Sequence, residues 1–478
     1  MRSFAAILVI LILFQSSLAQ NIGIGTNAPS SNAILDIRST SKGVLLPRLT
    51  TSQRNAIANP ELGLMVFDTD KGTLYLYDGL KWQRINFGEP GSSTLVEVES
   101  SNAVAGDNFG NSVDINGDYA VVGAPNDDVN GRIDQGSAYV FQRNNGAWAE
   151  IAQLTAIDGL SGDQFGSSVG IYGDYLVVGS PGDDIGSNSD QGSVYVFNRQ
   201  GNTWVQINKF SDPSGAALDA FGSSVDISID RFIVGAPNDN IGSNADQGSA
   251  HVYLLTGTTW AFEISLTAID ATPNSLFGVA VSVSFNTVLI GATGASSGGG
   301  SFKGAAYLYG KIISSWSFLS KLISTSPGTF NFGGSVSLDG NTAAVGEWAS
   351  TVFPTPVYIG RVNVYFRTNV TTWPLQALID NPVKTNFHQF GTSVTLSGDI
   401  LMVGSLQPTT NPNNFGQDSA NISVFKRTGT DWNFVNNYFT SYPAGAFGFS
   451  VSMSGFNAII GAPLRKTSKG QVFFMNLE

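Results

Sequence analysis

The stretch FGNSVDINGDYAVVGAP at residues 109–125 decides the fold, because its pattern returns along the chain. Its two apolar segments, 112–115 and 119–124, are separated by the turn-forming pair Gly117-Asp118, which predicts two adjacent antiparallel strands. The second segment is apolar without alternation, as expected for a strand that is covered on both faces. Two further segments, 137–142 and 148–154, precede the next Phe-Gly and complete a unit of four predicted strands.

Phe-Gly recurs every 55 to 58 residues, with its Phe at positions 109, 165, 221, 277, 332, 390 and 447. Four antiparallel strands in a repeat of this length are typical of one blade of a β-propeller. The 55 glycines and the many short runs of Val, Ile, Tyr and Phe also favour an all-β chain. The sequence therefore predicts an all-β fold containing a seven-bladed β-propeller with four-stranded blades.

The ends of the repeat region predict how the ring closes. The seventh repeat stops at its third strand, 471–475, so its fourth strand has to come from elsewhere. Counting back from Phe109 places Leu95–Glu99 where the fourth strand stands before Phe165. We therefore expect residues 95–99 to complete the last blade and leave no open edge. The recurring Phe residues are expected to be buried plugs between neighbouring blades.

Two landmarks of the repeat also indicate a family. Phe-Gly together with Gly-Ala-Pro, at 123–125, 235–237 and 461–463, resembles the FG-GAP repeats of integrin α subunits and of many secreted bacterial proteins. The resemblance covers residues 106–478 and implies a propeller used in adhesion or ligand binding. Integrin-type repeats often carry calcium between the first two strands, as D-x-D-x-D-G-x-x-D. Here that connection is the short turn at Gly117, so those calcium ligands do not carry over.

A similar oxygen-rich spacing occurs in the loop after the second strand. Asn126, Asp128, Asn130 and Asp134 stand at positions one, three, five and nine, with Gly131 at position six. Calcium takes six to eight oxygen ligands, which a tight turn can bring together. These four residues are therefore the candidate calcium ligands, and calcium is the candidate cofactor. The alternative is that the Asp and Asn side chains cap turns by bonding the nearby backbone.

Composition narrows the classes of partner and chemistry. The 478 residues carry a net charge of −12, and no Lys/Arg-rich stripe is visible, which argues against a nucleic-acid partner. The absence of cysteine excludes disulfides, thiolate metal sites and a cysteine nucleophile.

The first 19 residues predict a signal peptide. Arg2 precedes an apolar run over 4–14, and the small residues Ser17 and Ala19 predict cleavage after Ala19. The run is too short to cross a bilayer comfortably, although an uncleaved anchor is the alternative. No second apolar segment approaches membrane-spanning length, so we expect a secreted or cell-surface protein with no membrane span in the mature chain.

Residues 20–92 do not follow the repeat and form a separate N-terminal β-rich module with its linker, leaving 93–478 for the propeller. The stretch 21–57, followed by GLMVFDTDKGTLYLYDGLKWQRI at 63–85, resembles a leader module of secreted and fibre-like proteins of Bacteroidota. Residues 65–67 and 74–77 predict a hairpin, and residues 90–93, PGSS, predict the linker. So short a β module buries little by itself, so we expect it to form a homo-oligomer or to pack on the propeller.

The predicted ligand-binding residues lie after Gly346 in the fifth repeat. This apolar stretch carries Trp348, Phe353 and Tyr358, and Trp348 stands outside the Trp series that recurs in the other repeats. Exposed aromatic residues on loops over a rigid scaffold are typical contact residues. The alternative is that Trp348 packs under its own loop.

Catalysis has little support in the sequence. The chain has two histidines; His251 occupies a strand position that other repeats fill with tyrosine, and no Gly-x-Ser-x-Gly nucleophile elbow follows a strand. We therefore predict no enzymatic activity, and expect an extracellular adhesion protein that binds a protein or glycan through propeller rim loops. The alternatives are an extracellular carbohydrate-active enzyme on a propeller scaffold and a structural component of a surface or fibre.

Overall fold

The computed structural model describes residues 22–24, 35–37, 39, 44–70, 73–77, 82–84, 95–270, 272–296, 303–326, 329–350, 360–382, 389–406, 420–440 and 445–477. The predicted signal peptide, the predicted linker and the candidates Phe353 and Tyr358 lie outside these residues. The chain divides into two compact units, Met1–Pro90 and Gly91–Glu478. No helix in the described ranges is both long and apolar enough to cross a membrane.

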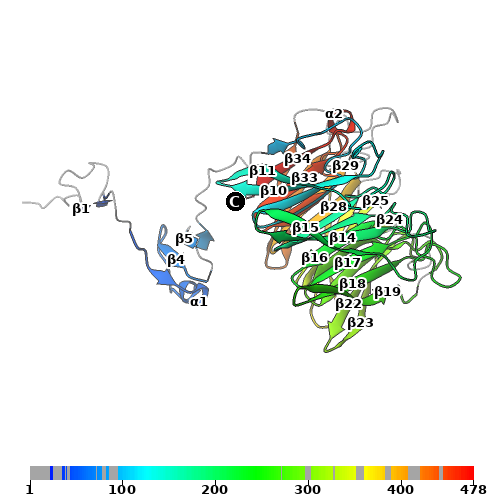
Figure 1. The fold of residues 1–478 in the computed structure, drawn as a ribbon. Helices are drawn as coiled ribbons and strands as arrows, with labels where there is room; N and C mark the ends of the chain where they lie inside the picture. Colours follow the sequence, from blue (N-terminus) through cyan, green and yellow to red (C-terminus); the bar gives the residue numbers. More distant parts are fainter. Residues whose placement is uncertain are drawn as a thin grey trace, which may run out of the picture. The chain divides into compact units, whose positions relative to one another are not determined.

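The described part of Gly91–Glu478 forms seven four-stranded antiparallel sheets, here called blades 1 to 7 (Figure 1). Blades 1 to 4 each use four consecutive strands: β8 (Ser112–Asn116), β9 (Tyr119–Ala124), β10 (Ser137–Asn144) and β11 (Ala147–Leu154); β12 (Ser168–Tyr172), β13 (Tyr175–Ser180), β14 (Ser193–Gln200) and β15 (Thr203–Phe210); β16 (Ser224–Ser228), β17 (Arg231–Ala236), β18 (Ser249–Thr256) and β19 (Thr259–Leu266); β20 (Phe277–Ser284), β21 (Thr287–Ala292), β22 (Ala305–Ile312) and β23 (Ser315–Leu322). The strands predicted for the first repeat are confirmed and extend one or two residues further at some ends.

Blades 5 and 6 are built in the same way. Their strands are β24 (Thr329–Asp339), β25 (Thr342–Ser350), β26 (Arg361–Phe366) and β27 (Leu375–Asp380); then β28 (Gln389–Ser397), β29 (Ile400–Leu406), β30 (Asn421–Thr428) and β31 (Asp431–Phe439). Blade 7 contains β32 (Val451–Ser454), β33 (Asn457–Ala462) and β34 (Gln471–Asn476), with the short helix α2 (Arg465–Ser468) between the last two. Its fourth strand is β7 (Val96–Val98).

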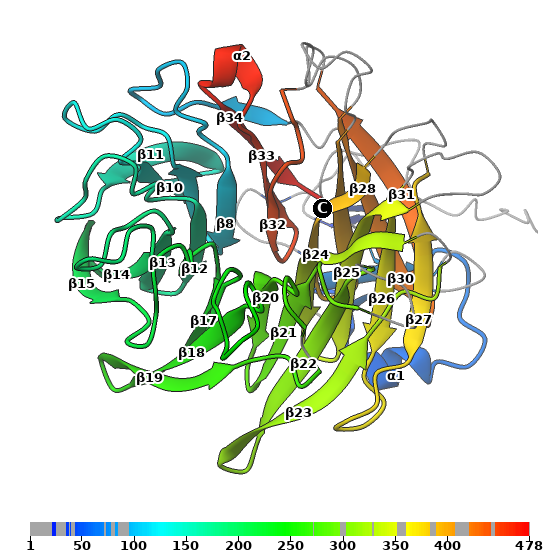
Figure 2. The ribbon, with the colours of Figure 1, turned by 90° about the vertical axis from the view of Figure 1, so that its right-hand side faces the viewer.

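The blades are arranged in a closed ring. The first strand of each blade contacts the first strand of the next, and β32 of blade 7 contacts β8 of blade 1. Figure 2 shows these sheets placed around a common centre. Strand β7 pairs antiparallel with β34, with Val98 opposite Val472 and Val96 opposite Phe474. The prediction that residues 95–99 supply the missing strand is therefore confirmed, and the fold is an all-β propeller.

The landmark residues hold neighbouring blades together. All seven Phe residues of the Phe-Gly pairs are fully buried, as predicted. Between blades 1 and 2, Ser112 Oγ donates a hydrogen bond to the Gly166 carbonyl oxygen at 2.8 Å. A Cβ on Gly123 would lie 1.9 Å from the same carbonyl oxygen, so this position of Gly-Ala-Pro has to be glycine. The Gly of one Phe-Gly pair therefore packs on the Gly-Ala-Pro glycine of the preceding blade.

A polar cavity of about 270 Å³ lies at the centre of the ring and is lined by the first strands of all seven blades. Side chains here accept hydrogen bonds from backbone N–H groups of the next blade, such as Asp114 from Ile171 N at 2.7 Å and Asp226 from Val283 N at 2.7 Å. Burial raises the pKa of Asp114 to about 6. Burial and the charge of Asp114 raise the pKa of Asp226 to about 7. The side chains that line the cavity thus join neighbouring blades, and two of them are carboxyl groups with a raised pKa.

The unit Met1–Pro90 is small and separate. Strands β1 (Ile22–Ile24) and β2 (Leu35–Ile37) pair in parallel, and β3 (Arg48–Leu49), β4 (Met65–Asp68), β5 (Thr73–Tyr77) and β6 (Trp82–Arg84) form a sheet in that order. The predicted hairpin is confirmed as the antiparallel pair β4–β5. Helix α1 (Thr51–Asn55) starts with a capping box between Thr50 and Gln53. Its buried Arg54 lies 3.4 Å from the Asp68 carboxylate and stacks over the Tyr75 ring.

Candidate functional site

The loops between strands two and three and those between strands four and one meet at one end of the propeller. In an antiparallel blade these two kinds of connection lie at the same end, whereas the tight turns between strands one and two and between strands three and four lie at the other. Backbone hydrogen bonds join the two kinds of loop: Gly162 N donates to Ile133 O at 2.9 Å, and Phe165 N donates to Gln135 O at 2.9 Å. Arg132 Nη1 also donates to Gly159 O at 2.6 Å. This end, here called the loop rim, is therefore a continuous and well-braced surface across blades 1 and 2.

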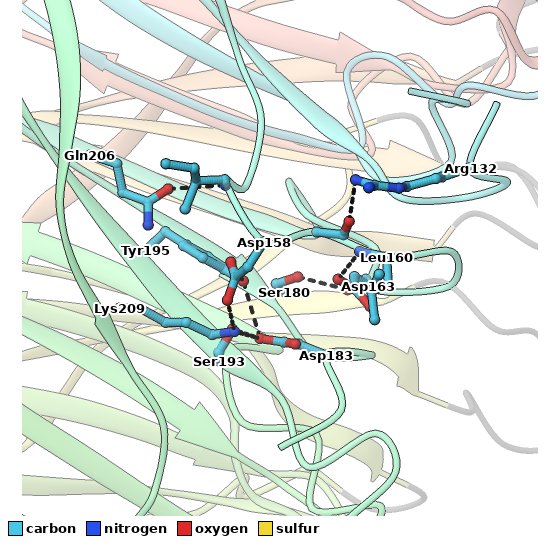
Figure 3. A network of polar contacts seen from close by, with 12 residues as sticks. Arg132, Asp158, Leu160, Asp163, Ser180, Asp183, Ser193, Tyr195, Gln206 and Lys209 are labelled. Atoms are coloured by element: carbon cyan, nitrogen blue, oxygen red, sulfur yellow. Dashed lines mark hydrogen bonds and ion pairs between the residues drawn. The ribbon is translucent and has the colours of Figure 1, made fainter. Parts of the chain in front are cut away.

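A network of charged and hydroxyl groups supports the loop rim in blade 2 (Figure 3). Lys209 Nζ lies 2.7 Å from Asp158 Oδ2 and 2.7 Å from Asp183 Oδ2. The Tyr195 hydroxyl lies within hydrogen-bonding distance of both carboxylates, at 3.0 and 3.1 Å. Burial opposes the charge on Lys209, but its hydrogen bonds to Asp158 and Asp183 outweigh burial, so the pKa of Lys209 is raised. Loop and strand are thus tied together by a permanently charged lysine.

The structure brings three of the four candidate calcium ligands together through hydrogen bonds. Asn126 Nδ2 donates to Asp134 Oδ1 at 2.9 Å, and the Asp134 backbone N–H donates to Asp128 Oδ1 at 3.0 Å. Asn108 Nδ2 donates to the Asn126 side-chain oxygen at 2.9 Å, and Asn130 is exposed with a φ of 52°. These hydrogen bonds agree with the alternative interpretation, in which the Asp and Asn side chains cap turns of the loop. Calcium binding by Asn126, Asp128, Asn130 and Asp134 stays a prediction.

The same cap recurs in the next two blades. Asp190 N donates to Asp184 Oδ1 at 2.9 Å, and Asp246 N donates to Asn240 Oδ1 at 2.9 Å. A bond that spans six residues and returns with the repeat shapes each loop into the same conformation. The Asp and Asn residues therefore recur at the same spacing because each repeat uses them to shape the same loop.

Trp348 lies in strand β25 and not in a loop. The β24–β25 hairpin of blade 5 is longer than its equivalents, pairing Phe332 with Glu347 and Phe330 with Ala349, so the strand continues past Trp348. The indole is half-buried, and its Nε1 is 2.8 Å from where a Cβ on Gly334 would lie. Trp348 therefore packs partly on its own hairpin, while Phe353 and Tyr358 lie outside the described residues. Ligand contact by Trp348, Phe353 and Tyr358 stays a prediction.

Sequence reasoning overlooked a set of exposed aliphatic side chains on the loop rim. They are all more than half exposed, and we call them the aliphatic set: Val104, Ile133, Ile157, Leu160, Leu218 and Ile269. A signal was present, because Ile157 and Ile269 each stand eight residues before a Phe-Gly pair, and Val104 and Leu160 each stand five before one. Large apolar side chains repeated at one end of a molecule are a common mark of an interaction surface.

The ring and its loop rim define the class: this is a β-propeller that presents loops at one end. Residues 96–141, 148–197, 204–253 and 260–309 match the FG-GAP repeat family. Residues 23–103 match the family described as a phage tail like trimerisation region. No match to the chain was found among curated proteins.

Proposed function

We propose that this protein is an extracellular adhesion protein that binds a protein ligand through the loop rim of its propeller. The observation that carries the proposal is the aliphatic set, in which Ile157 is 85% exposed. Its loop is held by hydrogen bonds to the neighbouring loop, such as the one from Arg132 to Gly159 O. Burying such side chains against a partner is favourable by about 25 cal/mol per Å². Since the loops are already ordered by hydrogen bonds, little conformational entropy is lost on binding.

The N-terminal unit supplies the second part of the proposal. A region that resembles a trimerisation module would join three chains and present three loop rims together. Three weak contacts on one molecule bind a surface with an apparent affinity that exceeds each single affinity by about 10²–10⁴-fold. The propeller then recognises the ligand, and the N-terminal unit provides avidity. Residues 1–19 direct the chain out of the cell, so the mature protein starts at Gln20.

No enzymatic reaction is part of the proposal. FG-GAP repeats and trimerisation regions are modules of binding and assembly. Asp114 and Asp226 line the central cavity, and both accept hydrogen bonds from neighbouring strands. That role in joining blades accounts for them without chemistry on a substrate.

The test uses the mature chain and an array of extracellular proteins and glycans. The variant Ile157→Asp/Leu160→Asp should lose at least about tenfold in affinity for the protein it captures, because two apolar contacts are replaced by charges. The matched control is Ile313→Asp, which is 99% exposed at the β22–β23 turn at the other end of the blade and should bind normally. Sedimentation should give three chains per particle. Capture of glycans alone, with equal affinity for both variants, would contradict the proposal.

A further inference from the structure

Blade 3 departs from its neighbours at one buried polar position. On the third strands, His251 occupies the place that Tyr195 has in blade 2 and Tyr307 has in blade 4. Across the sheet, Tyr195 is paired with Lys209 and Tyr307 with Lys321, but His251 is paired with Ser265. Blade 3 has therefore exchanged a tyrosine and a lysine for a histidine and a serine.

The lysine has a clear role in the neighbouring blades. Lys209 lies 2.7 Å from each of two carboxylates in blade 2, and Lys321 Nζ lies 2.7 Å from Asp270 Oδ2 in blade 4. A buried or half-buried carboxylate is costly unless a positive charge or several hydrogen bonds compensate it. Where the lysine is absent, other groups have to compensate the carboxylate, as the hydrogen bonds from Ser137, Tyr139 and Gln153 do for Asp127 in blade 1.

Blade 3 keeps its carboxylates without the lysine. Asp212 follows strand β15, Asp239 follows strand β17, and both are buried with His251, which is 2% exposed. One potential ligand atom from each of the three lies within 4.8 Å of the others, and His251 Nε2 is 3.6 Å from Asp212 Oδ2. Across the ranges the structure describes, no lysine or arginine forms an ion pair with Asp212 or Asp239. Two negative groups thus share a site with one imidazole.

Two further polar atoms beside this cluster are buried and lack a hydrogen-bond partner among the described residues. One is His251 Nδ1, and the other is Oδ1 of Asp219, whose side chain is 1% exposed. Burial raises the pKa of Asp219 to about 6, and the charges of Asp239 and Asp212 add to the shift. A third carboxyl group therefore faces the same negative charge. Buried charges are stable when they are paired or bind a metal ion, and an ion at this cluster would meet that need.

The contacts of the His251 imidazole fix its orientation at the cluster. The ring is held in place by edge contact with Phe221, at a centroid distance of 5.2 Å. Ser249 Oγ lies 2.9 Å from Nε2, which therefore points toward the polar side of the cluster. An imidazole nitrogen held beside two carboxylates is a common arrangement of metal ligands.

We propose that His251 Nε2, Asp212 and Asp239 bind one divalent transition-metal ion of the zinc type. Zinc binds histidine nitrogen and carboxylate oxygen at about 2.0–2.2 Å, which places neighbouring ligand atoms of a tetrahedron about 3.3–3.6 Å apart. The nitrogen ligand favours a transition metal over calcium or magnesium, which prefer oxygen. The ion takes the place of the lysine charge and ties the loops after β15 and β17 to strand β18. It stabilises the loop rim and is independent of the ligand proposed above.

The test measures zinc binding by the full mature chain without an affinity tag. After treatment with EDTA and buffer exchange, titration calorimetry with ZnCl₂ should give one site per chain with a Kd of about 1 µM or tighter. At a free zinc concentration about 100 times the Kd, Tm should rise by roughly 3 °C. Cobalt in place of zinc should give the visible absorption of a four-coordinate site, whereas CaCl₂ should not compete.

Variants separate this site from adventitious binding. The double variant His251→Tyr/Ser265→Lys restores the pair found in blade 2, so it should fold with an unchanged circular dichroism spectrum and lose the zinc site. His388→Ala removes the other histidine of the chain and should keep one zinc per chain. The proposal is overturned if the wild-type chain shows no zinc binding with a Kd below about 100 µM. It is also overturned if the folded double variant still binds one zinc per chain.

Discussion

At the scale of the residue, three positions explain why the short motifs of the repeat occur together. Ser112 binds the Gly166 carbonyl oxygen, and Gly123 leaves room for that same carbonyl. The Phe beside Gly166, Phe165, is fully buried. Each motif therefore makes its contacts only when the next blade is packed against it. This is why the pattern persists through seven repeats while the loops between the motifs differ.

Truncating one buried Phe should lower stability strongly. Phe221→Ala removes a fully buried ring between blades and should reduce the free energy of unfolding by about 3–5 kcal/mol. Denaturant unfolding followed by tryptophan fluorescence measures the change. Phe434→Ala, at a position 47% exposed on β31, should cost less than about 1 kcal/mol. Equal losses in the two variants would show that Phe221 is not a structural plug.

A second residue-scale prediction concerns the central cavity. Burial and the charge of Asp114 raise the pKa of Asp226 from its ordinary value of 3.8 to about 7, so the folded state holds a proton that the unfolded chain has released between about pH 4 and 7. Stability should therefore fall as pH rises through this window. A shift of this size corresponds to at most about 4 kcal/mol, because one pKa unit is worth about 1.4 kcal/mol.

The measurement compares thermal unfolding of the wild-type chain and Asp226→Asn from pH 4 to pH 8. The amide mimics the protonated carboxyl, so the variant should gain relative stability with rising pH, and the difference should level off above about pH 7. Asp431→Asn, at an exposed carboxylate on β31, is the control for the loss of one charge. A constant difference between wild type and Asp226→Asn at every pH would refute the titration.

At the scale of the element, the strands were predictable and the chemistry of the loops was not. The apolar run 119–124 and the turn at Gly117 are local signals, so β8 and β9 could be placed from sequence. Strand β7 could be placed because the repeat gave its register. In contrast, Trp348 falls in a strand because the partner strand β24 is unusually long, and nothing local to Trp348 reveals this.

The same distinction applies to the site in blade 3. His251 was recognisable as an exception to a tyrosine position, and structural burial was the natural interpretation. Its proximity to Asp212 depends on the path of the loop after β15, where Asp212 stands nine residues before Phe221, while Asp158 stands seven before Phe165. A two-residue shift within a loop has no periodic signal, so only the three-dimensional structure brings the two side chains together.

At the scale of the whole molecule, the closing strand links the start of the propeller to its end. Lys466 forms an ion pair with Glu99, and Gln471 Nε2 donates to Glu99 Oε1 at 2.7 Å, so side chains reinforce the pairing of β7 with β34. Without β7, strand β34 would become an open edge of about six residues in the last blade. The ring therefore depends on residues that lie immediately after the N-terminal unit.

Two truncations should separate ring closure from assembly. A chain that starts at residue 94 keeps β7, so it should fold as a monomer with the Tm of the propeller in the full chain. A chain that starts at residue 100 lacks β7 and exposes β34, so its Tm should be lower by several degrees, and it should aggregate through the open edge. Calorimetry and sedimentation measure both effects. If the two chains melt at the same temperature and stay equally soluble, the fourth strand of blade 7 contributes nothing to closing the ring, and residues 94–99 serve only to connect the two units.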